Sequence, residues 1–354
     1  MIERLTAHQF RCLEAVELTI PSEGAVIVGD NGAGKTSILE AIYFLARGRS
    51  FRQPRSERLI QFGKEDLQLT ARLLWGSKSH QVGVALSRKS GARIRIDGAD
   101  QKSLAPVGTE IAVQVLEPEI HRLVSEGPDA RRSFLDYGVF HVEPGYLGAW
   151  RRYRQALKQR NAALKRHASD DQLSAWDTEM VAVAETVDGY RRGYVNLISE
   201  PLNALAASLG LPTVALSYRP GWEDGTQFVD ALEKVRANDR ERQTTSVGPH
   251  RADLAIRWAG RMARPTVSRG QQKLLASALV LAQTQLVARL KQDSTILLLD
   301  DPGAELDRNA LDRLMQVIGD MPGQHIVTAL DSNHLSARHQ GAVFHVEHGK
   351  VHAI

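Results

Sequence analysis

Alternating apolar and polar positions indicate the first strands of this chain. The alternating segments are residues 2–10, 13–20, 67–74, 80–87 and 93–97. A period of two places apolar side chains on one face of a strand, so the first two segments predict a hairpin and the other three an antiparallel meander. The dipeptide Asp97-Gly98 lies at the end of the last segment and is typical of a tight turn.

Unbroken apolar runs and helical periodicity predict the remaining elements. Strands are expected at residues 25–30, 111–119, 213–218, 252–260, 294–301 and 324–330, with a final hairpin at 343–354. Helices are expected at 31–48, in several pieces across 128–210, at 226–240, after residue 272 and from Asp307. The fold class is therefore α/β: residues 1–120 and 244–354 form one domain, and a mainly helical insertion, residues 121–243, divides it.

Composition limits the classes of protein to which this chain can belong. It has 354 residues, of which 43% are hydrophobic and 24% charged, which is typical of a soluble globular protein. Cys12 is its single cysteine, so no intrachain disulfide forms, and we expect this small residue to be buried. There is no apolar run of about 18 residues and no signal-peptide core, so we expect a cytoplasmic protein without a membrane span. The net charge of +4 does not by itself identify a nucleic-acid partner.

A glycine-rich segment between a predicted strand and a predicted helix matches the Walker A pattern. Its glycines allow consecutive backbone N–H groups to surround phosphate oxygens. The lysine ammonium would then lie near the β- and γ-phosphates, and the threonine hydroxyl would bind Mg²⁺. The predicted phosphate-binding residues are Gly29, Asp30, Asn31, Gly32, Ala33, Gly34, Lys35, Thr36 and Ser37.

The apolar strand at residues 294–301 ends in two carboxylates, Asp300 and Asp301. A buried parallel strand delivers its last residues to the edge of the sheet where ligands bind. We expect Asp300 to hold Mg²⁺ through water and Asp301 to orient or deprotonate the attacking water. The alternative is a pair of helix-capping or turn aspartates, which the presence of a phosphate loop in the same chain makes less favoured.

Ser268, Gly270 and Gln271 lie at the start of an apolar helix. Hydroxyl, amide and backbone N–H donors at a helix N-terminus form an anion site. These residues resemble the ABC signature, Ser-Gly-Gly-Gln, with Arg269 in place of the first glycine.

With this signature, the chain resembles ABC-type ATPases of the SMC/RecF group. Residues 304–307, AELD, resemble the D-loop, and Gln114 occupies the place of the Q-loop glutamine, a ligand of Mg²⁺ and a catalytic residue. The resemblance implies an ABC-type P-loop ATPase head with a mixed sheet. It also implies that the signature of one protomer covers the γ-phosphate of ATP bound to the other.

Within this group, the resemblance is to the RecF family of bacterial recombination mediators. The motifs that carry it are FRCLEAVEL, GDNGAGKTSILEAIYFLARGRSFR, FLDYGVFHVEPGYLGAWRRYRQALKQRNAALK, GPHRADL and LLLDDPGAELD. The resemblance implies an ATP-dependent homodimer that binds duplex and gapped DNA without sequence preference. It further implies that the protein works with RecR and RecO to load RecA in replication-linked repair and the SOS response.

Two departures from ABC transporters indicate slow hydrolysis. Thr328-Ala329 occupies the place of the transporter switch histidine, and Asp301 is one methylene shorter than the transporter glutamate. We therefore expect a weak ATPase that acts as a switch. An ATPase subunit of another ABC system, such as a transporter, is the alternative, but the switch histidine that it requires is missing.

A run of cations follows the predicted start of the insertion, and no acidic residue lies between Glu143 and Asp170. On a helix, Trp150, Tyr153, Leu157 and Leu164 share one stripe, and a basic stripe of Arg151, Arg154, Lys158 and Lys165 lies beside it. Such a stripe can neutralise phosphates of duplex DNA. A solvated basic face or a protein contact remains open as an alternative.

Overall fold

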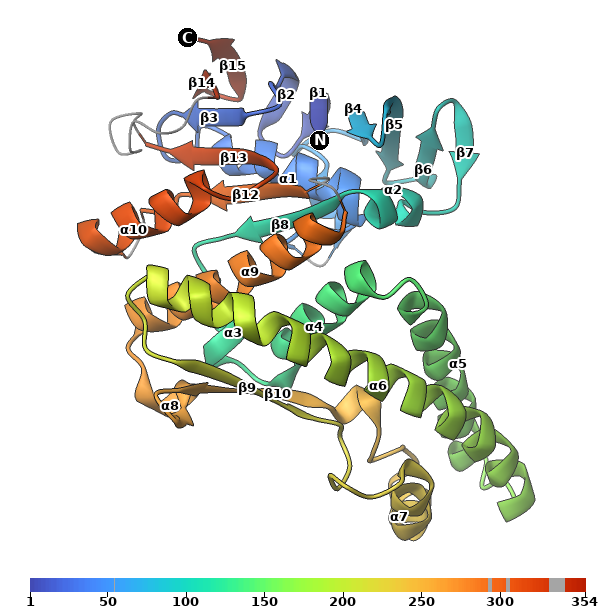
Figure 1. Cartoon of the computed structure of the whole chain (residues 1–354). Coiled ribbons are helices and arrows are strands. Elements are labelled where there is room, and N and C mark those ends of the chain that lie inside the picture. Colours follow the sequence, from blue (N-terminus) through green and yellow to red (C-terminus); the bar gives the residue numbers. More distant parts are fainter. Residues whose placement is uncertain (54, 292–294, 304–305, 331–340) are drawn as a thin grey trace. The chain divides into compact units, whose positions relative to one another are not determined.

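The computed structural model describes residues 1–53, 55–291, 295–303, 306–330 and 341–354. The chain forms two compact units, each drawn in Figure 1. The first, called the head, combines Met1–Ile120 with Ser277–Ile354, and the second, called the helical unit, is His121–Ala276. The C-terminal boundary of the helical unit thus lies after residue 276, whereas the sequence analysis places it after residue 243. The boundary lies later because a strand that follows residue 243 pairs within the helical unit.

One sheet of the head is parallel apart from β15, the last strand of the chain, which is antiparallel. Its order is β15-β14-β3-β13-β12-β8. The strands are β3 (Gly24–Val28), β8 (Ala112–Leu116), β12 (Thr295–Asp300), β13 (Gln324–Ala329), β14 (Ala342–Glu347) and β15 (Lys350–Ala353). Every residue of β3, β12 and β13 is buried, which explains why apolar residues follow one another in these strands instead of alternating with polar ones. The polar residues of β12 and β13 are buried as well, and they include Asp300, Gln324 and Thr328.

The second sheet of the head is antiparallel, in the order β2-β1-β4-β5-β6-β7. Its strands are β1 (Ile2–Phe10), β2 (Leu13–Thr19), β4 (Asp66–Trp75), β5 (Lys78–Ser87), β6 (Gly91–Ile96) and β7 (Ala99–Gln101). Asp97-Gly98 forms the predicted turn, with φ of 50° and 81°. Other elements of the head are η1 (Ser56–Leu59), α2 (Ala105–Glu110) and α10 (Arg308–Gly319).

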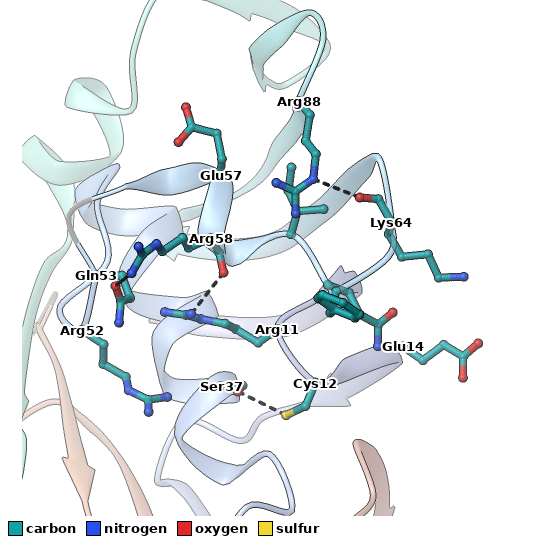
Figure 2. A pocket seen from close by; sticks show the side chains of 13 residues that line it. Arg11, Cys12, Glu14, Ser37, Arg52, Gln53, Glu57, Arg58, Lys64 and Arg88 are labelled. Carbon is teal, nitrogen blue, oxygen red and sulfur yellow. Dashed lines mark hydrogen bonds between the residues drawn. The ribbon is translucent and has the colours of Figure 1, made fainter.

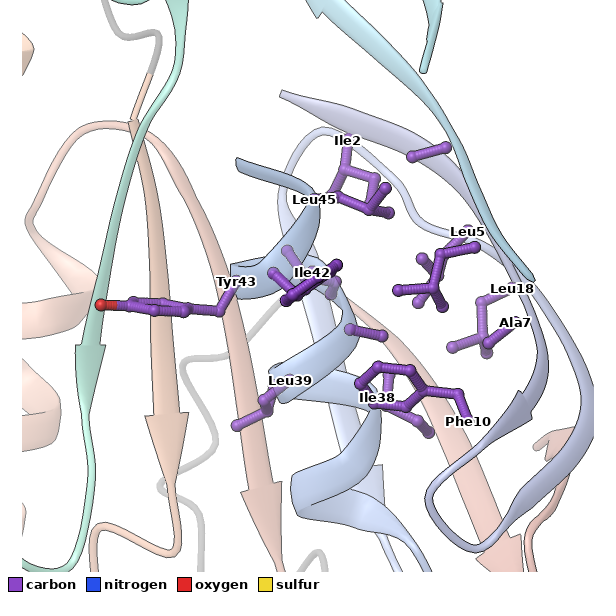
Figure 3. Close-up of a cluster of buried hydrophobic side chains, with 14 of the residues drawn as sticks. Ile2, Leu5, Ala7, Phe10, Leu18, Ile38, Leu39, Ile42, Tyr43 and Leu45 are labelled. Carbon is purple, nitrogen blue, oxygen red and sulfur yellow. The ribbon is translucent and has the colours of Figure 1, made fainter. Parts of the chain in front are cut away.

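Helix α1 (Lys35–Arg47) is apolar around most of its circumference because it packs between the two sheets. Figure 3 shows Ile38 and Ile42 directed toward Phe10 and Leu5 of β1, while Tyr43 points the other way. The two sheets also share one buried amide. The Ile2 N–H donates to Gln324 Oε1 (2.8 Å), and Gln324 Nε2 donates to the carbonyls of Ile2 (2.9 Å) and Pro21 (2.7 Å).

The helical unit contains four helices of 15 residues or more and a small sheet. Its helices are α3 (Arg122–Ser125), α4 (Pro128–Val142), α5 (Tyr146–Lys165), α6 (Asp170–Ser208), α7 (Phe228–Arg242), η2 (Pro249–Arg251) and α8 (Ala263–Thr266). The sheet order is β11-β10-β9, from β9 (Val214–Arg219), β10 (Asp253–Trp258) and β11 (Arg261–Met262). Helix α9 (Arg269–Leu290) begins in this unit and ends in the head.

Arg160 is fully buried, although it lies among the exposed cations of α5. Its Nε donates to Asp177 Oδ1 (2.6 Å), and its Nη1 donates to Asp239 Oδ2 (2.7 Å) and Thr245 Oγ1 (2.8 Å). Arg236 donates to the other oxygen of Asp177 (3.0 Å). This ion network joins α5, α6 and α7. The sequence predicts a purely apolar buried face for α5, but the structure adds a buried arginine to it.

His250, in the motif GPHRADL, is a structural histidine of the helical unit. The Tyr153 hydroxyl lies 2.6 Å from His250 Nδ1, and His250 Nε2 lies 3.1 Å from the Thr245 carbonyl. Because a carbonyl only accepts, Nε2 carries the proton and Nδ1 accepts from Tyr153. Burial lowers the pKa of His250 to about 4.

We predict that the helical unit loses stability on acidification. The pKa of His250 is 6.5 in the unfolded chain and about 4 in the folded chain, so between these pH values only the unfolded chain binds the proton. The free energy of unfolding is therefore highest above pH 6.5 and declines as the pH falls toward 4. At pH 5 the expected loss is about 2 kcal/mol. Urea unfolding at pH 7 and pH 5 measures it, with His250→Gln as the control that cannot titrate. An equal pH effect in both proteins would contradict this role.

Candidate functional site

The phosphate loop joins β3 to α1 through glycines that no other residue can replace without strain. Gly29, Gly32 and Gly34 have φ of 152°, 83° and 122°. A Cβ on Gly29 would lie 2.2 Å from the Val346 carbonyl oxygen, and one on Gly34 would lie 2.9 Å from Leu13 Cδ2. The exposed positions of the loop are Asp30, Asn31 and Gly32.

Lys35 is buried at the first turn of α1 and folds back on the loop. Its Nζ donates to the carbonyls of Gly29 (2.6 Å) and Asp30 (2.9 Å). Burial lowers the pKa of Lys35, and the charges of Asp301, Asp300 and Asp30 partly oppose this shift. The ammonium therefore lies in a partly desolvated position between the loop and the acidic end of β12, where an anionic ligand would stabilise it.

Thr36 and Asp300 meet, as expected for a P-loop site. The Thr36 hydroxyl donates to Asp300 Oδ1 (2.7 Å). Burial raises the pKa of Asp300, while hydrogen bonds from Thr36 and Thr328 lower it. A hydroxyl and a carboxylate in contact are oxygen ligands of the kind that Mg²⁺ prefers, so the residues fit this ion.

Asp301 directly follows β12 and has a left-handed backbone, with φ of 47°. Its N–H donates to Thr328 Oγ1 (3.0 Å). Aspartate tolerates this conformation better than most residues, and the strand turns sharply at this position. One cluster in the head thus combines two pairs of neighbouring residues, Lys35-Thr36 and Asp300-Asp301. More than 260 residues separate the two pairs in sequence.

Gln114 lies on β8 opposite Leu297 of β12. Its Nε2 donates to Gln283 Oε1 on α9, and its side chain is mostly buried. A metal ligand at this position would have to give up the bond to α9. The proposed role of Gln114 at the metal thus stays a prediction.

The residues of the signature cap their own helix. The Ser268 N–H donates to Gln271 Oε1 (2.9 Å), and the Gln271 N–H donates to Ser268 Oγ (3.4 Å), which is the reciprocal pattern of a capping box. Ser268 and Gln271 are exposed and Gly270 is half-buried. Because Ser268 Oγ accepts in this arrangement, its own proton remains available for an anion.

The D-loop segment is only partly described. Ala304 and Glu305 lie outside the described residues. Asp307 is the N-cap of α10, and its carboxylate accepts from the Ala310 N–H (2.9 Å). The helix predicted from Asp307 therefore begins where the sequence indicates.

The basic stripe of α5 is exposed along its full length. Arg151, Arg154, Lys158 and Lys165 are all exposed, whereas Tyr153 and Leu164 of the neighbouring stripe are buried. Among the residues that the structure describes, none of these four cations forms an ion pair. Arg152, on the same helix, pairs with Glu179 (2.8 Å).

A basic pocket of about 1070 Å³ adjoins the phosphate loop (Figure 2). Cys12 and Ser37 line it, with their Sγ and Oγ atoms 3.4 Å apart, and Cys12 is exposed rather than buried as the sequence suggests. Its charged lining comprises five cations and two carboxylates: Arg11, Arg52, Arg58, Lys64, Arg88, Glu14 and Glu57. No motif joins these residues, so sequence analysis does not find this pocket.

Comparison with known proteins identifies the family. The family RecF/RecN/SMC N terminal domain matches residues 1–352. The chain is 39% identical to the "DNA replication and repair protein RecF" of Xanthomonas axonopodis pv. citri (strain 306), covering 99% of this chain and 98% of the relative. The chain belongs to the RecF family. It is also 38% identical to the RecF of Shewanella sediminis (strain HAW-EB3), covering 100% and 99% of the two chains.

Solved structures of RecF and Smc heads share this fold. A structure described as "recombination mediator protein RecF-ATP in RecFOR pathway" has a TM-score of 0.89 at 23% identity, covering 100% of this chain and 97% of that chain. An Smc head bound to the C-winged helix domain of ScpA has a TM-score of 0.61 at 18% identity, with coverage of 100% and 96%. The predicted ABC-type head and RecF family are thus confirmed. Within the described residues, no helix is sufficiently long and apolar to cross a membrane.

Proposed function

We propose that this chain is an ATP-switched, DNA-binding homodimer that acts as a recombination mediator at DNA gaps. The observation that carries the proposal is the cluster of Lys35, Thr36, Asp300 and Asp301 beside a glycine-rich phosphate loop. With RecR and RecO, the dimer would load RecA in replication-linked repair and the SOS response. Support for this pathway comes from the RecF family, whose relatives are named DNA replication and repair proteins.

In the proposed mechanism, the loop amides and Lys35 bind the phosphates of ATP. Lys35 would exchange its bonds to the Gly29 and Asp30 carbonyls for phosphate oxygens. Thr36 and Asp300, with Gln114, would hold Mg²⁺, whose charge offsets that of the β- and γ-phosphates. Asp301 would orient the attacking water, and its short side chain favours slow hydrolysis.

The basic pocket of Figure 2 is our proposed site for the nucleoside part of ATP. Its wall includes Ser37, two residues beyond Lys35 on α1, so a nucleotide that fills the loop would extend into it. In the dimer, Ser268, Gly270 and Gln271 of one protomer would cover the γ-phosphate held by the other. The exposed positions of Ser268 and Gln271 support this role.

The basic stripe of α5 is the proposed DNA contact. Arg151 and Lys165 are separated by 14 helical residues, or about 21 Å, and duplex DNA carries one charge per roughly 1.7 Å of axis. The four cations lack carboxylate partners within the described parts of the chain, so phosphates would not have to displace any. Contacts of this kind position DNA without reading its sequence.

We predict that charge reversal at Arg151, Arg154 and Lys158 weakens binding to gapped duplex DNA. The plot of log K against log salt has a negative slope of about −0.9 per phosphate contact, so losing three contacts should make it shallower by roughly 2–3. Fluorescence anisotropy across a salt series, with and without ATP, measures both the slope and the effect of ATP on DNA affinity.

A matched control reverses three exposed lysines of the antiparallel sheet and its loops, Lys78, Lys89 and Lys102. It changes the net charge by the same amount and should leave the slope close to that of wild type. An unchanged slope in the α5 variant would assign the stripe to solvent or to a protein partner. Binding that is equal with and without ATP would contradict the proposed switch.

A further inference from the structure

Thr328 is the fifth residue of β13, is fully buried, and lies opposite Asp300 of β12 in the parallel register. Its Oγ1 is 3.0 Å from Asp300 Oδ1, 3.0 Å from the Asp301 nitrogen and 3.3 Å from the Leu299 carbonyl oxygen. One hydroxyl therefore contacts the last three residues of the acidic strand end.

The directions of these hydrogen bonds follow from the donors present. The Asp301 N–H has a proton to give, so Thr328 Oγ1 accepts from it. The single hydroxyl proton of Thr328 then goes to Asp300 Oδ1, which is nearer and more basic than the Leu299 carbonyl. Because Thr36 donates to the same Oδ1 (2.7 Å), two hydroxyls hold one oxygen of Asp300 and leave its other oxygen for water or a cation.

We propose that Thr328 is a positioning residue for both aspartates of the site. It holds the Asp300 side chain directly, and it holds Asp301 through the backbone N–H at the left-handed turn. This inference rests on the ATPase activity proposed above. Thr328 itself contacts no nucleotide in this role, and it acts only through Asp300 and Asp301.

A packing role alone would not require the hydroxyl. Threonine and valine have almost the same shape and both favour strands, so valine would fill this position in β13 equally well. Valine would, however, leave the Asp301 N–H without its acceptor and remove one of the two donors to Asp300. The two roles therefore predict different results for Thr328→Val.

The test compares Thr328→Val with Thr328→Ser, which keeps the hydroxyl. We expect Thr328→Val to weaken Mn²⁺ binding in the presence of a non-hydrolysable ATP analogue by about 10-fold, measured by electron paramagnetic resonance. ATP turnover should also fall by about 10-fold or more, whereas ATP binding without divalent cation should stay within about 3-fold of wild type. Thr328→Ser should resemble wild type in all three measurements.

Wild-type Mn²⁺ affinity and turnover in Thr328→Val would overturn the inference and leave a packing role. If Thr328→Val does not fold, Thr328→Ser and Thr328→Ala, which differ by one oxygen atom, replace it in the same comparison, and equal behaviour would overturn the inference. A wild-type protein that neither binds nor hydrolyses ATP would instead refute the proposed function itself. The two failures are therefore distinguishable.

Discussion

Lys35→Ala is expected to lower ATP affinity by about 100-fold or more and to abolish the ATP-driven dimerisation that we propose. Charge-assisted bonds to phosphate are among the strongest hydrogen bonds in proteins, and no other cation follows the loop glycines on α1 until Arg47. Without this ammonium, the γ-phosphate would not be held for the signature of a second protomer. Equilibrium dialysis with labelled ATP and sedimentation velocity measure the two losses.

Two variants separate this effect from general loss of charge. Lys102→Ala removes an exposed cation of the head and should leave ATP affinity and dimerisation unchanged. Lys35→Arg keeps the charge but not the compact ammonium, so it should recover only part of the affinity. Normal ATP-dependent dimers of Lys35→Ala would refute the assigned role.

Asp239→Ala is expected to destabilise the helical unit by about 3–5 kcal/mol, because it removes one partner of a buried ion network. Arg160 would keep its charge at a fully buried position with only Asp177 to compensate, and Asp177 is already shared with Arg236. Ser246 would also lose the acceptor of its N–H (3.0 Å) and hydroxyl (2.6 Å). Urea unfolding followed by helical circular dichroism measures the change.

Asp171→Ala is the matched control, because Asp171 is exposed at the start of α6 and its loss should change stability by less than about 0.5 kcal/mol. The double variant Arg160→Met, Asp239→Leu removes the charge and its partner together, so it should be more stable than Asp239→Ala. Equal losses in Asp239→Ala and Asp171→Ala would show that the network contributes little.

Local patterns predict the head well because its key residues lie at ends of regular elements. Lys35 begins α1, Asp300 ends β12, and Asp307 caps α10, and each follows from a strand or helix that periodicity identifies. Parallel pairing then brings the ends of β3, β12 and β13 to one edge of the sheet. The meeting of Thr36 with Asp300 is therefore a consequence of topology that sequence can anticipate.

Features that depend on partners distant in sequence were not predictable in this way. Arg160 has the sequence context of an exposed cation, and only Asp177 and Asp239, brought in by α6 and α7, make its burial possible. The pocket beside Cys12 is likewise assembled from separate turns and strands. In the sequence, Thr328 is notable only because it stands where ABC transporters have a histidine. Its hydrogen bonds depend on the register of β13 with β12, which the sequence does not reveal.

The pairing of β3 has a consequence for how this chain is synthesised. Strand β3 ends at Val28, but both of its neighbours, β13 and β14, lie after residue 323. A ribosome making about 5–20 residues per second needs on the order of 15–60 seconds to cover that distance. The helical unit ends at Ala276 and is therefore made in full before β13, whereas the apolar β3 waits without partners throughout. The nascent head is therefore the part of this chain most exposed to aggregation, and we expect chaperone depletion to lower its soluble yield before it affects the isolated helical unit.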